Sequence, residues 1–168
     1  MARFYTGIGS RETPKKILGD MEMMAKDLSK INYILRSGGA KGADTAFELG
    51  AECGKMVIYR PQDSIPDWAY EEVAKFIPKD RPPLHRMNDW VQKLLARNMM
   101  QILGDDGNSP SNFVICWTPK GVDDGGTGYA IRCAWEHDIR VYNLKNPKAA
   151  GYISEFIMER KKYQRSVR

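Results

Sequence analysis

Glycine-rich loops at the ends of short apolar runs constrain the fold of this chain more than any other feature. The longest loop runs Arg36-Ser37-Gly38-Gly39-Ala40-Lys41-Gly42-Ala43-Asp44, after the β-prone run Tyr33 to Arg36 and before a helical pattern. Loops at Gly7 to Arg11 and Gly125 to Gly128 lead into helical patterns in the same way. Repeated strand, loop and helix units are typical of a parallel sheet covered by helices.

Five β-prone runs alternate with helical patterns along the chain. The expected strands are Phe4 to Ile8, Tyr33 to Arg36, Met56 to Tyr59, Phe113 to Trp117 and Ile139 to Tyr142. Helices are expected from Thr13 to Leu28, Thr45 to Cys53, Trp68 to Phe76, Met87 to Leu103 and Ala149 to Arg160, and a further helix through Ala130, Ala134 and Trp135 follows the loop Gly125 to Gly128. Thr13 is the expected cap of the first helix, and apolar spacing predicts that Trp90, Val91 and Trp135 face the core. This alternation predicts an α/β, Rossmann-like three-layer domain with a mainly parallel sheet.

The chain has 168 residues, 42% of them hydrophobic, which suits one domain. We expect residues 1–158 to form it and residues 159–168 to be a basic, solvated tail. That tail holds five basic residues and one acidic residue, so residues 1–158 carry a net charge of only +1 out of +5. No apolar run is long enough for a membrane helix or a signal peptide, which predicts a cytoplasmic protein with no membrane partner.

Cysteine and histidine patterns indicate neither a disulfide framework nor a metal site. Cys53, Cys116 and Cys133 are odd in number and widely spaced, so we expect buried free thiols. His85 and His137 form no recognisable ligand pair, so no metal and no cofactor is expected.

The loops are suited to phosphate. Glycine lets a phosphate approach backbone N–H groups closely, and a following helix N-terminus adds unpaired donors and partial positive charge. Lys41 and Arg11 could add side-chain charge. The Walker sequence and the GxGxxG pattern are both absent. A glycine pair after a strand can also be a tight turn without a ligand, so the loops count chiefly in combination.

Four segments, spread over Tyr5 to Leu144, resemble the ordered motifs of the DNA-processing protein A family. They are Gly9-Ser10-Arg11, the run from Ser37 to Ala46, Arg97-Asn98 and Gly126-Thr127-Gly128-Tyr129-Ala130. That family is part of a superfamily of nucleotide-ligand Rossmann-like domains (SLOG type), which also contains the cytokinin-activating phosphoribohydrolases. The resemblance implies one anion-binding crevice lined by Gly9, Ser10, Arg11, Ser37, Gly38, Gly39, Ala40, Lys41, Gly42, Asp44, Arg97, Asn98, Gly125, Gly126, Thr127 and Gly128.

The chain departs from both branches of that superfamily. Ile131 and Arg132 stand where the phosphoribohydrolases carry catalytic acids, which leaves Asp44 and Glu48 as the only carboxylate pair to offer for catalysis. We expect Asp44 to order its loop instead and Glu48 to be a solvated helix residue. Members of the family that handle single-stranded DNA usually carry extra helical domains, and we expect 168 residues to leave no room for them.

Three functions therefore stay open. The first is binding or sensing of a nucleotide or a nucleotide-derived phosphorylated ligand. The second is single-stranded DNA binding by a recombination-mediator-like protein, with the basic tail acting near the crevice, in a homodimer. The third is N-glycosidase (phosphoribohydrolase) activity on nucleoside monophosphates through Asp44 or Glu48. For the first function, we expect Lys41→Ala, or bulk at Gly39 or Gly42, to abolish binding without disturbing the fold.

Overall fold

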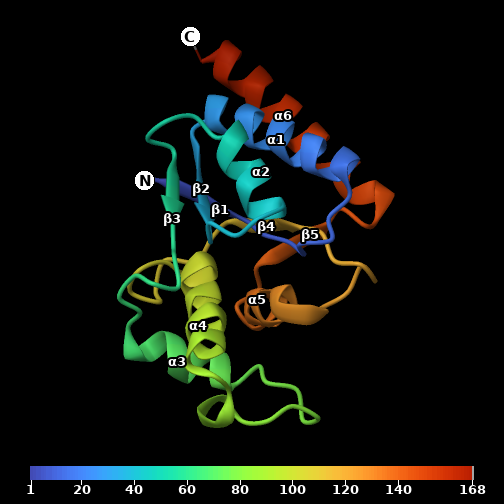
Figure 1. The fold of residues 1–168 in the computed structure, drawn as a ribbon. Coiled ribbons are helices and arrows are strands. Elements are labelled where there is room, and N and C mark those ends of the chain that lie inside the picture. The colour runs from blue at the N-terminus through green and yellow to red at the C-terminus, as the bar shows by residue number, and fades with distance from the viewer. Residues whose placement is uncertain (168) are drawn as a thin grey trace.

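A computed structural model describes residues 1–167 and contains a five-stranded sheet in which every strand is parallel to its neighbours. The strand order is β3-β2-β1-β4-β5 (Figure 1). The strands are β1 (Arg3–Gly7), β2 (Tyr33–Ser37), β3 (Met56–Ile58), β4 (Phe113–Cys116) and β5 (Arg140–Asn143). The chain builds outward from β1 in one direction and then returns to continue from β1 in the other. Such a switch in order leaves a crevice at the carboxyl ends of the two central strands.

Helices cover both faces of the sheet and confirm the predicted three-layer α/β fold (Figure 1). One face carries α1 (Lys15–Lys30), α2 (Ala43–Gly50) and α6 (Pro147–Ser166). The other carries α3 (Asp67–Ala74), α4 (Asp89–Leu103) and α5 (Gly125–Glu136), with the short 3₁₀ turn Leu84–Arg86 between α3 and α4.

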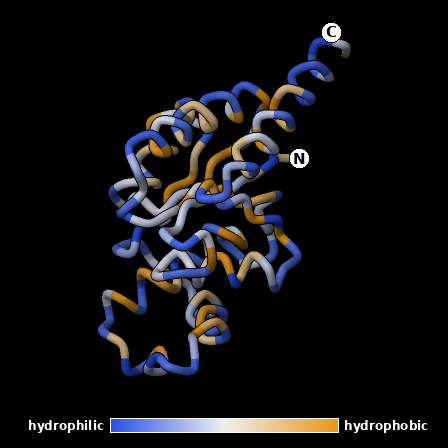
Figure 2. Tube along the Cα trace, turned by 90° about the vertical axis from the view of Figure 1, so that its right-hand side faces the viewer, coloured by the Kyte–Doolittle hydropathy of each residue, from blue (hydrophilic) through white to orange (hydrophobic). Residues whose placement is uncertain are grey.

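Alternating side chains of the strands serve two separate hydrophobic cores. Tyr5 and Phe113 pack with Phe47 of α2 under the first helical layer, while Val114 packs with Met99 of α4 under the second. The orange strands in the middle of Figure 2, surrounded by more hydrophilic helices, show the same arrangement. Period-two alternation with both faces buried explains why the strands are almost continuously apolar.

Several local expectations were wrong. Thr13 does not cap α1; its buried hydroxyl donates to the carbonyl oxygen of Ser10 at 2.6 Å, and Pro14 precedes the helix. Trp90 and Trp135 are 51% and 52% exposed, and Val91 is exposed too. Trp90 and Val91 are exposed because they lie in the N-terminal part of α4, and only the C-terminal end of α4 lies close to the sheet (Figure 1). Cys116 and Cys133 are buried as expected, but Cys53 is exposed.

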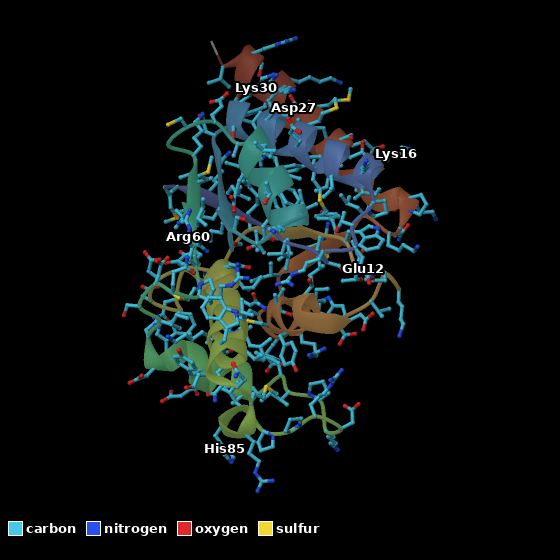
Figure 3. The ribbon with its side chains drawn as sticks, viewed as in Figure 1. Glu12, Lys16, Asp27, Lys30, Arg60 and His85 are labelled. Atoms are coloured by element: carbon cyan, nitrogen blue, oxygen red, sulfur yellow. The ribbon has the colours of Figure 1, made fainter. Side chains whose placement is uncertain are left out.

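Most of the segment that we expected to be a separate basic tail is helical, because α6 continues to Ser166. Lys161 donates to Asp27 of α1 at 2.8 Å, and this bond lowers the pKa of Asp27 (Figure 3 labels Asp27). Figure 2 shows the hydrophilic last turns of α6 extending past the sheet. Arg160 and Tyr163 share a depression with Met1 and Arg3, at the start of β1, so the basic residues lie at the sheet edge opposite to the crevice. Arg168 lies outside the described residues.

Residues 1–167 contain no helix with the length and apolar character that a membrane span requires.

Candidate functional site

A cavity of about 550 Å³ lies where the loops after β1 and β2 meet the start of α5 and one face of α4. This is the carboxyl edge of the sheet, at the switch in strand order. Ten of the residues that the sequence predicted for the site line it: Gly9, Ser10, Arg11, Ala40, Asp44, Arg97, Asn98, Gly125, Gly126 and Thr127. Ser37, Gly38, Gly39, Lys41, Gly42, Gly128 and Glu48 are not among the lining residues.

Most N–H groups of the loop after β2 are already occupied by carboxylates of α2. Asp44 Oδ2 accepts from the backbone N–H groups of Gly38 and Ala40, both at 3.2 Å. Glu48 Oε1 accepts from the N–H of Gly39 at 3.0 Å and from the hydroxyl of Ser37 at 2.7 Å. Asp44 thus orders its loop, while the expectation that Glu48 is a solvated helix residue was wrong. The N–H groups of Gly38, Gly39 and Ala40, three residues expected to bind the ligand, are therefore bound to the chain's own acids.

The glycines of this loop are needed by the fold itself. A Cβ on Gly38 would lie 1.3 Å from Nη1 of Arg97, so the arginine occupies the space that a side chain would fill. Gly39 and Gly42 have φ angles of 69° and 92°, in the left-handed region that disfavours other residues. The expectation that bulk at these two positions would leave the fold intact is therefore unsupported. Lys41 is exposed.

Arg97 of α4 is the central charged group of the cavity wall, with only 7% of its surface exposed. Its Nη1 lies 3.8 Å from Asp44 Oδ2 and 3.5 Å from the carbonyl oxygen of Tyr59. With its amide oxygen turned inward, Gln101 accepts from Arg97 Nη1 at 2.7 Å and from the N–H of Gly38 at 3.0 Å. The Nε of Arg97 has no partner within the described part of the chain.

Burial dominates the protonation of this pair. It raises the pKa of Asp44 to about 6, although Arg97 and the loop N–H groups act in the opposite direction. It also lowers the pKa of Arg97, despite the attraction of Asp44. Sequence reasoning missed Gln101, whose position one helical turn after Arg97 was the available signal.

The start of α5 forms the third wall. Asp124 caps the helix by accepting from the N–H of Gly125 at 3.0 Å, and Asn98 of α4 donates to the carbonyl oxygen of Gly126 at 3.1 Å. The N–H groups of Gly126 and Thr127 make no hydrogen bond within residues 1–167, which leaves two helix N-terminal donors beside the cavity.

Ile131 and Arg132, the two positions that the sequence comparison with the phosphoribohydrolases singled out, have structural roles. Ile131 is buried in the second core. Arg132 donates to Asp123 Oδ2 at 2.9 Å and to the carbonyl oxygen of Phe76 at 3.0 Å. These two positions therefore hold α5 in place and supply no carboxylate.

The rest of the lining is partly acidic and partly apolar. Glu12 lies between the start of α1 and α5 (Figure 3), and with Asp44 and Asp124 it sets three acids against Arg11 and Arg97. Apolar groups that the sequence analysis did not assign to the site complete the surface: Ile8, Val91, Leu94, Leu95, Pro119 and Ala130. A site with both charge signs and an apolar wall suits a ligand that combines an anion, hydroxyl or amino donors and a flat ring.

No protein-family model and no curated protein matches the sequence. Among solved structures, the chain is similar to DNA processing protein A from Helicobacter pylori, described for its unique mode of binding single-stranded DNA. The superposition has a TM-score of 0.61 and 18% sequence identity, and covers 96% of this chain and 80% of the other. At this identity the similarity establishes a shared fold, that of a Rossmann-like α/β domain.

Proposed function

We propose that the cavity binds a nucleotide or a nucleotide-derived phosphorylated ligand. The observation that carries this proposal is Arg97, a buried arginine whose Nε has no partner among residues 1–167, in the wall of a cavity formed by three strand-end loops. The volume of about 550 Å³ falls within the range of small-molecule sites.

The lining offers polar and apolar surfaces, which would contact different parts of such a ligand. Arg11, Arg97 and the free N–H groups at the start of α5 supply positive charge and donors for a phosphate. The acids Glu12, Asp44 and Asp124 would accept hydrogen bonds from sugar hydroxyls or from amino groups of a base. The apolar side chains of α4 offer a surface for the face of a base.

Ligand panels test the proposal directly. Mononucleotides, cyclic nucleotides and dinucleotides should raise the melting temperature in a saturable way, and the matching nucleosides without phosphate should do so much less. Arg11→Ala should weaken binding by about 10- to 100-fold, the effect of one charge-assisted hydrogen bond. Lys16→Ala is the matched control, because Lys16 is exposed on α1 outside the cavity (Figure 3).

Gly126→Leu tests the location of the site by filling it. A Cβ on Gly126 meets no atom within 4 Å, and Gly126 lines the cavity, so the new side chain should block the ligand while the fold stays intact. Failure of every phosphorylated ligand in the panel to bind the parent protein would refute the proposal. The same incubations are assayed for free base, since release that Asp44→Asn abolishes would show turnover by the carboxyl group whose pKa is about 6.

Single-stranded DNA is the second candidate ligand, and the fold shared with the DNA-binding protein of Helicobacter pylori supports it. In that case a short oligonucleotide should bind more tightly than its mononucleotide, with affinity falling steeply as salt rises. Because the basic end of α6 lies at the opposite edge of the sheet, Arg11→Ala should weaken this binding and Arg165→Glu should not. Equal affinity for the oligonucleotide at low and high salt would count against DNA as the ligand.

A further inference from the structure

Three metal-ligand side chains meet at the contact between α3 and α5. Glu72 comes from α3, Cys133 from the last turns of α5, and His137 directly follows α5. Their ligand atoms all lie within 4.8 Å of one another. The sequence analysis overlooked that Cys133 and His137 are four residues apart, which places them on one side of a helix.

The existing contacts hold the three groups in place. His137 Nε2 and Glu72 Oε1 are 2.9 Å apart, and the other carboxylate oxygen of Glu72 contacts Lys75. The backbone N–H of His137 donates to the carbonyl oxygen of Cys133 at 3.2 Å, which fixes the spacing of these two residues. Cys133 is fully buried, whereas His137 is 37% exposed and provides an entry from solvent.

We infer that Glu72, Cys133 and His137 form a binding site for a borderline-soft divalent cation, Zn²⁺ in particular, which ties α3 to α5. Sulfur, imidazole nitrogen and carboxylate oxygen together form a donor set that Zn²⁺ accepts, whereas Mg²⁺ and Ca²⁺ favour oxygen alone.

The side chains have to adjust to accept the ion, because their ligand atoms lie up to 4.8 Å from one another. Zinc–ligand bonds of about 2.0–2.3 Å place tetrahedral ligand atoms roughly 3.3–3.5 Å apart. Glu72 Oε1 and His137 Nε2 must therefore separate by about half an ångström, and Cys133 Sγ must approach them by up to about 1.3 Å. Rotation of the exposed imidazole and of the Glu72 side chain can supply both changes. Three protein ligands leave a fourth position for water.

Charge and the outer contacts also agree with the assignment. Thiolate and carboxylate together neutralise a divalent cation, and the thiol proton of Cys133 is released to solvent when the metal binds. Lys75 would remain on the second oxygen of Glu72 and orient the carboxylate, as outer partners of metal ligands commonly do. Arg132 bonds the carbonyl oxygen of Phe76 nearby, so the ion would add to an existing link between α5 and the segment after α3.

Cobalt is the spectroscopic probe for this site. Titration of chelator-treated, reduced full-length protein with Co²⁺ should give one equivalent of a species with a thiolate-to-cobalt charge-transfer band and the strong visible bands of tetrahedral cobalt. Added Zn²⁺ should remove both bands. Zn²⁺ should also raise the melting temperature of the parent protein in a saturable way.

Variants separate this site from chance thiol binding. Cys133→Ser should abolish the charge-transfer band, and His137→Gln should weaken metal binding by about tenfold or more. Cys53→Ser and His85→Gln are the matched controls and should bind cobalt like the parent; Cys53 is exposed, and Figure 3 shows His85 well away from α5. If Cys133→Ser fails to fold, the exposed His137→Gln still decides the question. Absence of cobalt bands in the parent protein, bands that survive His137→Gln unchanged, or bands lost in Cys53→Ser would each overturn the inference.

Discussion

Gly38→Ala tests whether the glycine-rich loop is shaped by Arg97 or by a ligand. The added methyl group would lie 1.3 Å from Nη1 of Arg97 and 2.1 Å from the side-chain amide of Gln101, so the arginine has to leave its position. The backbone at Gly38 is not in the left-handed region, and alanine is therefore acceptable to the main chain itself. The cost comes from the displaced side chains.

The expected loss of stability follows from the contacts that Arg97 gives up when it moves. Its departure removes the ion pair to Asp44, and breaking a buried pair typically costs about 3–5 kcal/mol. Arg97 lines the cavity and can turn partly into solvent, so we expect a loss near the lower end, about 3 kcal/mol. For a chain of this length that corresponds to a fall in melting temperature of about 6–12 °C.

Gly126→Ala is the matched control. It adds the same methyl group to another glycine at this site, but in open space at the start of α5, where alanine favours the helix. Urea denaturation in the absence of ligand should show this variant within about 0.5 kcal/mol of the parent or slightly more stable. If Gly38→Ala proves as stable as Gly126→Ala, the placement of Arg97 against Gly38 is wrong.

Three further predictions concern other parts of the structure. Burial raises the pKa of Asp44 from 3.8 to about 6 in the folded state, so between these two pH values the folded state binds more protons than the unfolded chain. The free energy of unfolding should therefore fall as the pH rises from about 4 to about 6. Urea denaturation of Asp44→Asn should show a flatter dependence on pH over the same range. Lys161→Ala should lower stability by less than about 1 kcal/mol in thermal denaturation, because the Asp27–Lys161 pair is partly exposed, and Lys162→Ala should have no measurable effect. An alkylating reagent should modify exposed Cys53 in the native protein, but Cys116 and Cys133 only after unfolding, because burial raises the pKa of both thiols to about 12. Mass spectrometry reads out the modified residues. Modification of Cys116 in the native protein would contradict the packing of β4.

The sequence by itself determined the order of the strands and helices, the parallel sheet and the edge where the loops meet. Apolar runs such as Phe113 to Cys116 and the glycines that follow strands are local signals, and a parallel sheet brings the ends of its strands to one edge whatever the details of packing. Helix boundaries and inner faces were less reliable. Trp135 has helical spacing like that of core residues, but nothing local to α5 reveals that no neighbouring element covers it.

Only the tertiary structure decided what the loop after β2 does. Gly38, Gly39 and Ala40 look the same in sequence whether their N–H groups face a phosphate or a carboxylate. The position of α2 beside the loop places the carboxylates of Asp44 and Glu48 within hydrogen-bond distance of these N–H groups. Arg97 reaches the same loop from a helix more than fifty residues later, and Glu72 meets Cys133 and His137 across the contact between two helices. Contacts between residues so far apart in the sequence depend on how the helical layers pack against the sheet. The local sequence around each residue does not indicate them.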